Sequence, residues 1–507
     1  MEIERKYDVS PDHALPALHE VPGVTSTASD EQWLETMYYD TPELTLTSAR
    51  NTLRRRTGGD DAGWHLKRPD RDGEREEVRV PLGRATRTVP KVLRGQVRAI
   101  VRDRSLAPVA QLSTHRRVHR LLDDDGAVLA EFRDDAVTAQ ALGGPDANDP
   151  APMAWREWDV ELATGDRALL KTLEERITGA GGVPATGSSK LARALQGRLP
   201  AVAHEEPESP SPKGSAGGVV LTYLRTHVSE LISQDPLVRG DRPDSVHKMR
   251  VATRRLRSTL GTFRPLFDRN RTEPLRAELK WLADLLGAAR DAEVKRDRLR
   301  TMIEEQPAEL VVGPIKRRVT REQNEKYRSA HAGVTSALDS GRYLRLLDAL
   351  DTLVTDPPWT DQAPRRAEDA LPGLVRQRFT KMRRRLRSVD HAATSGERDH
   401  QLHEARKDAK KARYAAEALR PTAGKPAKKF ATGMESMQDL LGDHHDSVVV
   451  RDLLRRAAEA AHSAGEPTFT YGRLHALEQA HAQALEHAFA GVWKKASAKR
   501  RRQWLQD

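Results

Sequence analysis

The sequence predicts two domains of different structural class, so that the chain combines an α+β part with an all-α part. Residues 1–202 are expected to form an antiparallel β domain with flanking helices, and residues 218–490 a domain of helices alone. Three observations support this division. The apolar residues change from a period of two to a period of 3.6, the net charge changes sign, and the second half repeats itself.

The junction between the two halves is a segment of low apolar content, "AVAHEEPESPSPKGSAGG" at 201–218. It is rich in Pro, Ser, Glu and Gly, a composition that is typical of linkers. We therefore place a linker at 203–217. Residues 491–507, which follow the second domain, are predicted to form a basic tail.

The overall composition is that of a polar globular protein. The chain has 507 residues, of which 37% are hydrophobic and 31% charged, and this length is enough for more than one domain. It contains no cysteine, which excludes disulfides and thiolate-bound metals. There is no apolar run of roughly 18 residues or more and no basic-then-apolar leader. We therefore expect a soluble cytoplasmic protein.

Charge is distributed unevenly along the chain. Residues 1–200 hold 29 Lys and Arg against 32 Asp and Glu, a net charge of −3, whereas residues 201–507 hold 56 against 42, a net charge of +14. The two halves must therefore meet different electrostatic tasks. The basic half predicts a polyanionic partner, which could be nucleic acid, an anionic membrane or polyphosphate.

Short alternating runs bounded by Gly, Asp or Pro predict the β-strands of the first half. Strands are expected at 1–10, 51–58, 63–69, 75–82, 128–140 and 155–166, and a further strand is expected to begin at Arg116 and Arg117. Helices are expected at 86–101 and at 166–182, the second of which ends in glycines.

Ionisable residues recur at every second position of these strands and therefore share one face of each strand. Any one of these sets, taken alone, is usually a solvated surface. Together they predict a sheet with one ionisable face, which cannot be an apolar core but can line the wet interior of a barrel. Carboxylates there would hold Mg²⁺ or Mn²⁺, and basic groups would hold phosphate oxygens. The sets are Glu2, Glu4 and Lys6; Arg54 and Arg56; His65 and Lys67; Glu131, Arg133 and Asp135; and Glu157, Asp159 and Glu161.

The second half shows helical periodicity and an internal duplication. Helices are expected at 221–234, 247–263, 275–303, 371–389, 403–419 and 430–461. One shift recurs in three separate segments, which is hard to produce by chance, so we predict two related bundles at about 218–345 and 373–490. The equivalent pairs, 155 or 156 residues apart, are Asp291 with Asp446, His247 with His403, and Gly218 with Gly373.

Each repeat carries a basic helical face. A residue pattern of i, i+3, i+7 and i+10 keeps side chains on one side of a helix. A charged face is usually solvated surface, but this one recurs in both repeats and has few Glu or Asp partners. The two faces therefore predict a groove that needs an anion in it or water around it. They consist of His247, Arg250, Arg254 and Arg257 in the first repeat and His403, Arg406, Lys410 and Arg413 in the second.

The composition of these helices favours an anion that has phosphates and no bases. Proteins that bind single strands usually interleave aromatic residues with basic ones. Aromatic content is only 5%, and the basic helices carry little besides Tyr223, Phe379 and Tyr414. The helix at 376–387 alone has seven basic residues and no acidic one. The histidines could add further positive charge below neutral pH.

An ordered series of motifs in the first half is similar to one known family. The stretch "EIERK" resembles the ExExK signature of the CYTH domain, the triphosphate tunnel metalloenzymes. The motifs "YYDT", "LRRR", "HLK", "REE", "EFRDD", "EWDVEL" and "SSKLARAL" follow in the family's order, over roughly residues 1–200. The basic half, at about 215–490, resembles the CHAD domain, a histidine-bearing helical domain that is often fused to CYTH. The chain as a whole resembles a CYTH–CHAD fusion protein.

The CYTH resemblance implies an eight-stranded tunnel barrel that holds a triphosphate together with Mg²⁺ or Mn²⁺. Glu2, Glu4 and Glu157 are the implied catalytic carboxylates. The implied metal ligands are Glu2, Glu4, Glu131, Asp135, Glu157, Asp159 and Glu161, and the implied triphosphate ligands are Lys6, Arg54, Arg56, Lys67, Arg117 and Lys190.

Three positions leave alternatives in this assignment. Asp134 and Asp135 compete for one family aspartate, and Asp135 is preferred because it shares the face of Glu131. The neighbours Arg116 and Arg117 compete for one arginine. The family often has threonine two residues before the tunnel lysine, where this sequence has His65, a difference that could alter substrate orientation.

The CHAD resemblance implies paired helical bundles that bind inorganic polyphosphate through their basic faces. The implied ligands are His247, Arg250, Arg254, Arg255, Arg257, Arg378, Lys381, Arg385, His403, Arg406, Lys410, Lys411 and Arg413.

The leading functional hypothesis is therefore a metal-dependent triphosphate hydrolase joined to a polyphosphate-binding domain, in the cytoplasm, where it would associate with polyphosphate granules. Water would attack the metal-bound phosphate in line, oriented by a glutamate. The second hypothesis is a protein that binds polyphosphate without turning it over, and a third is a nucleotidyl cyclase or thiamine triphosphatase. No specific nucleic acid and no membrane partner are expected. Oligomeric state and the choice among tripolyphosphate, thiamine triphosphate and nucleoside triphosphates stay open.

Overall fold

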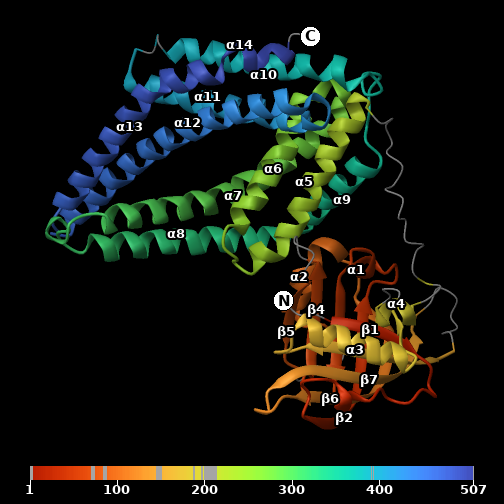
Figure 1. Ribbon diagram of the computed structural model, residues 1–507. Helices are drawn as coiled ribbons and strands as arrows, with labels where there is room; N and C mark the ends of the chain where they lie inside the picture. The colour runs from red at the N-terminus through yellow and green to blue at the C-terminus, as the bar shows by residue number, and fades with distance from the viewer. Residues whose placement is uncertain are drawn as a thin grey trace. The chain divides into compact units, whose positions relative to one another are not determined.

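The computed structural model describes residues 4–69, 75–83, 88–143, 151–185, 189–195, 198, 214–389, 391 and 393–505. These residues form two compact units, Met1–Glu205 and Glu206–Asp507. In the described residues, a single β-sheet with short helices makes up the first unit, and the regular structure of the second is helical (Figure 1). The predicted fold classes are therefore confirmed.

The first unit is built on a nine-stranded sheet in the order β5-β4-β3-β2-β6-β7-β8-β1-β9, with antiparallel neighbours throughout. Strand β2 was not predicted, and β6 begins nine residues before the strand start that was expected at Arg116. The strands are β1 Glu4–Val9, β2 Ser26–Asp40, β3 Thr52–Thr57, β4 Gly63–Pro69, β5 Arg75–Val80, β6 Ala107–Leu122, β7 Val128–Ala141, β8 Met153–Leu162 and β9 Val183–Pro184.

The sheet is not closed, so the expectation of an eight-stranded closed barrel is wrong. Within the described ranges, no ladder joins the edge strands β5 and β9. The strand β9 is only two residues long, and its second residue is Pro184, which has no backbone N–H to donate to a further strand.

Strand pairing nevertheless places the predicted ionisable residues on a common face. In an antiparallel ladder, directly opposed residues point to the same side. Lys6 lies opposite Asp159, Asp159 opposite Arg133, and Asp135 opposite Glu157. We call this side, which also carries Arg116 opposite Asp135, the inner face.

Two apolar clusters cover the other side of the sheet, the outer face. One joins helix α3, Arg167–Gly179, to β1, β7 and β8 through residues such as Leu173 and the fully buried Trp158. The other joins α2, Lys91–Val101, to β3 and β4 through residues such as Leu93 and Trp64. Figure 1 shows α3 lying across the strands.

A third cluster closes part of the inner face. Helix α4, Lys190–Ala194, packs against this face through Leu191 and the following Leu195. Their partners are Leu112, Val137 and Trp155, which lie on the same side of the sheet as Asp135. The inner face is therefore apolar where α4 packs and ionisable elsewhere. Lys190, the first residue of α4, lies at the boundary between the apolar and the ionisable part. The side chain of Ser189 caps α4 by accepting a hydrogen bond from the N–H of Ala192.

The second unit is a series of long helices. Helices α5 to α8 are followed, after α9, by α10 to α13, and a short α14 comes last (Figure 1). Their bounds are α5 Ala216–Arg239, α6 Ser245–Thr262, α7 Arg269–Glu304, α8 Ile315–Leu338, α9 Gly341–Thr355, α10 Ala367–Val389, α11 Ser395–Ala418, α12 Arg420–Ser463, α13 Phe469–Ala496 and α14 Lys499–Arg502.

Equivalent helices of the two repeats contact each other. Helix α5 contacts α10, and α6 contacts α11, so the basic faces predicted on α6 and α11 come together. A separate apolar cluster joins α7 and α8 to α12 and α13 through residues such as Leu299, Ile303, Leu454 and Tyr471. No helix in the described ranges combines the length and the apolar character required to cross a bilayer.

The turn between β3 and β4 depends on a glycine. Gly58 has φ +79° and packs so tightly that a Cβ would lie 1.9 Å from the carbonyl oxygen of Trp33. Gly126 has a similar φ, +77°, but a Cβ there would meet nothing within 4 Å. Gly58→Ala should therefore destabilise the protein by about 2–5 kcal/mol, through strain plus steric overlap.

The matched control is Gly126→Ala, which should cost only the backbone strain of about 1–2 kcal/mol. Thermal or denaturant unfolding of both variants measures the difference. Equal destabilisation would show that the close approach of Gly58 to Trp33 is unimportant.

Candidate functional site

The inner face of the sheet is centred on a buried carboxylate with two cationic partners. Arg116 donates two hydrogen bonds to Asp135, at 2.7 and 2.8 Å, and Lys190 Nζ lies 2.9 Å from the same carboxylate. Asp135 is fully buried. Burial alone would raise its pKa, but Lys190 and Arg116 hold the pKa of Asp135 well below its ordinary value. The carboxylate is therefore ionised.

Glu157 belongs to the same group. Lys190 Nζ donates to Glu157 Oε1, and Trp155 Nε1 donates to Glu157 Oε2 at 2.7 Å. Both carboxylate oxygens are thus engaged. The arrangement makes Glu157 a partner of Lys190, and a role in orienting water would require these bonds to change.

A second carboxylate pair lies where β1 meets β8. Lys6 Nζ is 2.7 Å from Glu4 and 3.4 Å from Asp159. Burial and the hydrogen bond to Glu4 raise the pKa of Asp159. Burial also opposes ionisation of Glu4, but the hydrogen bond from Asp159 and the charge of Lys6 lower its pKa. Asp159 is therefore the member of the pair that takes up a proton first as the pH falls.

Arg133 holds the neighbouring carboxylates in place. Its guanidinium lies 2.7 Å from Glu131, 2.6 Å from Glu161 and 4.0 Å from Asp159. Burial would lower the pKa of Arg133, but the surrounding carboxylates raise it above its ordinary value. The predicted metal ligands Glu131 and Glu161 are therefore neutralised by a cation of the chain itself.

The predicted arginines of β3 lie on the inner face beside an acidic residue of the following turn. Arg56 Nη1 is 2.6 Å from Asp61, and Arg54 Nη2 is 3.8 Å from the same oxygen. Burial lowers the pKa of Arg56, and the positive charges of Arg54 and Arg116 lower it further.

The position of the predicted tunnel lysine is also occupied by paired groups. Lys67 Nζ lies 3.9 Å from Glu77. His65, which is buried, has Nδ1 3.0 Å from the same Glu77 and Nε2 2.8 Å from the backbone carbonyl of Asp61. His65 therefore connects β5 to the turn that carries Asp61, a role that the sequence pattern did not indicate.

The register corrects one predicted residue. Arg117, which was assigned to the triphosphate site, lies on the outer face, 3.2 Å from Glu31 and 4.0 Å from Asp134. Its neighbour Arg116 is the one on the inner face, because alternate strand residues point to opposite sides. Asp135 lies on the inner face as preferred. Glu2 falls outside the described residues.

The fit of a divalent cation rests on the pair Glu4 and Asp159. In the described part of the chain, no three His, Asp or Glu side chains are grouped so as to hold a metal ion. However, Asp159 Oδ1 is buried without a hydrogen-bond partner there. Mg²⁺ is often held by one or two carboxylates, with substrate phosphates completing its shell. A carboxylate pair with a free oxygen fits such a cation.

The second unit contains a basic cavity of about 450 Å³ between the two repeats. Six of the predicted residues line it, three from α6 and three from α11. In the described lining, eight Lys and Arg residues face only two acidic ones, and none of the lining residues is Phe, Trp or Tyr. The predicted residues in the lining are His247, Arg250, Arg254, His403, Arg406 and Lys410.

The two acidic residues are the repeat-related Asp291 and Asp446. Arg250 Nη1 lies 3.3 Å from Asp291, and Arg406 Nη1 lies 4.0 Å from Asp446. Nε of each arginine is buried and has no hydrogen-bond partner in the described structure. Such orphaned donors are uncommon in folded proteins and indicate a place for an acceptor.

Two glycines in equivalent places of the facing helices lie beside these arginines, and the approach is tight at Gly442. A Cβ at Gly287 would be 3.6 Å from Nη2 of Arg250, and a Cβ at Gly442 would be 3.1 Å from Nη2 of Arg406. The glycines are 155 residues apart, the shift of the internal repeat. Mid-helix glycine is unfavourable by itself, so a repeated one indicates a close approach.

The like charges of the cavity perturb one another. Burial and three neighbouring arginines, led by Arg406, lower the pKa of Lys410 to about 6. Burial and neighbouring His445 lower the pKa of His403 to about 4, and burial with Arg290 lowers that of His247. The histidines are therefore neutral near pH 7 and gain charge only well below it.

The other predicted basic residues lie outside this cavity. Arg255 and Arg413 line an adjoining pocket of about 300 Å³, where both are paired with Glu417. Arg378 donates to the carbonyl of Gly261, and Arg385 lies 3.1 Å from Asp408. The remaining ones are Arg257, Lys381 and Lys411, of which Lys411 lies 3.2 Å from Asp408.

Sequence reasoning missed the cavity residues of α7 and α12. Arg290, Lys295 and His445 line the cavity, as does Lys407 of α11. A signal was present in part, because Arg290 directly precedes the repeated Asp291, and His445 precedes Asp446. Their approach to the basic faces of α6 and α11 depends on helix packing, which the periodicity did not specify.

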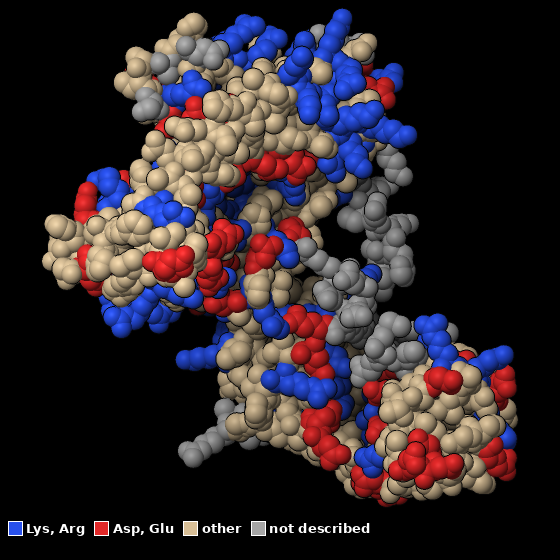
Figure 2. Space-filling model, turned by 60° about the vertical axis from the view of Figure 1, so that its left-hand side comes forward, with Lys and Arg blue, Asp and Glu red and all other residues tan. Residues whose placement is uncertain are grey.

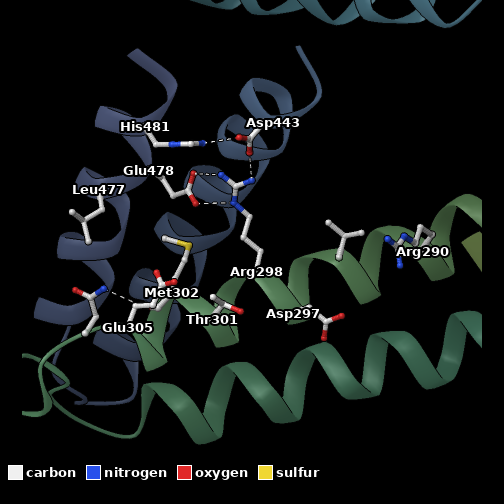
Figure 3. A pocket seen from close by; sticks show the side chains of 12 residues that line it. Arg290, Asp297, Arg298, Thr301, Met302, Glu305, Asp443, Leu477, Glu478 and His481 are labelled. Atoms are coloured by element: carbon white, nitrogen blue, oxygen red, sulfur yellow. Dashed lines mark hydrogen bonds and ion pairs between the residues drawn. The ribbon is translucent and has the colours of Figure 1, made fainter. Parts of the chain in front are cut away.

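Arg298 lines both this cavity and a neighbouring pocket of about 710 Å³. Figure 3 shows it reaching from α7 to the two helices of the second repeat. It lies 2.8 Å and 2.9 Å from the oxygens of Glu478 and 2.6 Å from Asp443, whose other oxygen is 2.9 Å from His481. Arg298 is therefore a link between the repeats rather than a free cation.

Comparison with known proteins gives two domain matches and a relative over nearly the whole chain. The model of the CYTH domain matches residues 1–191, and that of the CHAD domain residues 222–455. The uncharacterized protein Rv2226 of Mycobacterium tuberculosis is 39% identical over 491 residues, 94% of this chain and 93% of that protein.

Solved structures with similar folds are also found. PptA from Streptomyces chartreusis is 21% identical, covers 55% of this chain and 99% of its own, and has a TM-score of 0.46. The CHAD domain from the plant Ricinus communis is 22% identical, covers 56% and 95%, and has a TM-score of 0.44.

The lowered pKa of Lys410 predicts proton uptake when an anion enters the cavity. In the free protein, a pKa of about 6 leaves Lys410 mostly uncharged at pH 8. A bound anion favours the charged ammonium and raises that pKa, so binding of tripolyphosphate at pH 8 should take up as much as about one proton. Calorimetry in two buffers of different protonation enthalpy measures this uptake.

Lys410→Met should remove that share of the uptake, whereas Lys280→Met, on an exposed part of α7, should leave it unchanged. Identical uptake in the wild type and in Lys410→Met would contradict the assignment of the proton to Lys410.

Proposed function

The chain belongs to the family of proteins that join a CYTH domain to a CHAD domain, and we propose that it binds inorganic polyphosphate and hydrolyses a triphosphate. Polyphosphate would occupy the helical unit. The triphosphate, of which tripolyphosphate is the simplest, would react on the inner face of the β unit with Mg²⁺ or Mn²⁺. The observation that carries this proposal is the cavity in which eight basic residues face two acidic ones.

The chemistry of the cavity lining supports a ligand made of phosphates alone. Orphaned guanidinium N–H groups of Arg250 and Arg406 require acceptors, and phosphate oxygens accept from arginine in pairs. Bases would require stacking partners, and the described lining contains no Phe, Trp or Tyr. A chain of phosphates also matches the repeated, nearly symmetric placement of cations.

The inner face of the β unit supports phosphoryl transfer to water. Glu4 and Asp159 would hold the divalent cation, which would neutralise charge on the phosphate oxygens. Arg54, Arg56 and Lys67 approach the face from β3 and β4, and Arg116 and Lys190 from β6 and α4; together they would orient the triphosphate. Such reactions depend mainly on positioning and charge neutralisation. Glu2, with Glu4, remains a candidate for orienting the attacking water.

A second candidate function, binding without turnover, is favoured by a specific observation. The cations of the inner face are already paired within the chain, as Asp61 with Arg56 and Glu157 with Lys190 illustrate. A triphosphate must displace those carboxylates before it can bind. If this displacement leaves the phosphates poorly placed, the unit would hold them without hydrolysis.

Glu4→Gln tests the reaction, because it removes a charge and keeps the shape of the side chain. We expect metal-dependent phosphate release from tripolyphosphate to fall by at least about 100-fold, the scale of losing one electrostatic contribution to a transition state. Phosphate release from tripolyphosphate, ATP and thiamine triphosphate, with Mg²⁺, Mn²⁺ or neither, is the measurement.

Glu31→Gln is the matched control, since Glu31 is an exposed carboxylate on the outer face. It should hydrolyse like the wild type. Unchanged hydrolysis in Glu4→Gln would remove Glu4 from the site, and a wild type inactive on every triphosphate would replace hydrolysis with the binding function.

Replacing Arg250, Arg254, Arg406 and Lys410 with alanine tests the cavity. Polyphosphate binding releases counterions, so its affinity should fall as salt rises. The variant should bind long-chain polyphosphate at least tenfold more weakly, and the slope of log affinity against log salt should decrease by about 3. Titrations at several salt concentrations, with single-stranded DNA as competitor, measure both.

The matched control removes four exposed charges elsewhere, Arg317, Arg321, Arg342 and Arg345, and should bind nearly as the wild type does. Unfolding temperatures of both variants check that the fold persists. Equal affinity for DNA and polyphosphate, or equal losses in the two variants, would leave only a generic basic surface.

A further inference from the structure

One end of the helical unit carries a second gathering of basic residues, none of which lines the cavity. Figure 2 shows lysine and arginine side chains crowded at the upper end of this unit. We call it the terminal basic surface and define it by residues of three helices that meet there. They are Arg383 and Arg387 of α10, Lys429 of α12, and Arg500, Arg501 and Arg502 of α14.

Helix α10 presents two different basic flanks. Arg378 and Arg385 face neighbouring helices, where Arg378 donates to the carbonyl of Gly261 on α6 and Arg385 pairs with Asp408 on α11. Arg383 and Arg387, four residues apart, lie on the opposite flank by helical spacing. They line a pocket of about 230 Å³ together with Arg502 of α14. Three guanidinium groups from two helices therefore share one small pocket.

The C-terminal segment adds charge without acidic residues. Residues 494–502 contain six Lys and Arg and no Asp or Glu. Arg501 Nη1 donates to the carbonyl of Lys429 at 2.6 Å, and Arg502 Nε to that of Ser497 at 3.2 Å. Both contacts are to neutral backbone groups, and none of the ion pairs found among the described residues ties this surface to a carboxylate.

Aromatic packing fixes these cations in position. Trp493 of α13 stacks on Phe379 of α10 with ring centroids 5.9 Å apart, and Phe430 of α12 meets Trp504 edge to face at 6.0 Å. The packing fastens the C-terminal segment to α10 and α12. Like charges held close together on a rigid support repel one another, and an anion relieves that repulsion.

We propose that the terminal basic surface is a second binding site for a long inorganic polyphosphate chain, which occupies it and the cavity at the same time. This inference rests on the polyphosphate binding proposed above. Tripolyphosphate is too short to use both sites, whereas a long chain gains affinity from the second contact because the first holds it nearby. Nucleic acid is less well matched, because Phe379, Phe430 and Trp493 pack on other rings, which leaves fewer ring faces for stacking.

The test uses the full chain with Arg383→Gln, Arg387→Gln and Arg500→Gln combined. Binding of tripolyphosphate, long-chain polyphosphate and single-stranded DNA is titrated at several salt concentrations. We expect tripolyphosphate affinity within twofold of the wild type, long-chain affinity at least tenfold weaker, and a salt slope for the long chain smaller by about 2 to 3. The charge-matched control, Arg317→Gln, Arg321→Gln and Arg345→Gln, should lose less than threefold.

The outcomes separate this inference from the function on which it rests. Long-chain affinity that is unchanged, or that falls equally in the control, overturns the second site while leaving the cavity intact. Loss of DNA binding with unchanged polyphosphate binding also overturns it and assigns the surface to nucleic acid. A wild type that binds no polyphosphate of any length overturns the proposed function itself. Retained tripolyphosphate affinity and an unchanged unfolding temperature show that the variant is folded.

Discussion

Compensation of buried charge is the constraint on which both units depend. An ion removed from water must find a partner of opposite sign, or its protonation changes. In the β unit the partners are within the chain: Asp135 is fully buried and ionised because Arg116 and Lys190 contact it. In the cavity of the helical unit they are largely missing, and Lys410 responds with a pKa of about 6. The two units therefore solve the same electrostatic problem in opposite ways.

Packing in each unit serves this difference. Helix α4 packs on the inner face through Leu191 and Leu195, and this contact delivers Lys190 to the edge of the ionisable region. In the helical unit, Gly442 leaves room for Arg406, because a Cβ there would lie 3.1 Å from Nη2 of the arginine. An apolar contact positions a paired cation in one unit, and a missing side chain leaves room for a cavity cation in the other.

The fold was predictable wherever one local period dominated. Strict alternation identified the strands that carry Lys6, Asp135 and Asp159 and placed their side chains on one face, because side-chain direction in a strand is a local property. The recurring shift of 155 residues led to the prediction of a duplicated helical unit. Strand β2 was missed because its first half is polar on both faces and shows no alternation between apolar and polar residues.

The parts of the site that escaped prediction are those set by nonlocal contacts. The choice between Arg116 and Arg117 required the register of β6 against β7, which motif order alone does not fix. The pairing of Asp61 with Arg56 depends on how the turn after β3 folds back, and the place of Arg290 in the cavity depends on how α7 packs on α6. Residue types and spacing predicted which chemistry is present, but not which partner each group would find.

Under the function proposed above, the different states of charge compensation imply different roles for the two units. An anion that enters the helical cavity meets cations without sufficient partners, so binding adds new interactions and few existing ones are lost. A triphosphate on the inner face must instead displace carboxylates such as Asp61 and Glu157 from their cationic partners. Much of its binding energy therefore only offsets the loss of these existing ion pairs. The helical unit is thereby suited to retention of phosphate chains. The β unit is suited to discrimination, because only a ligand that reproduces the geometry of several displaced carboxylates at once offsets their loss.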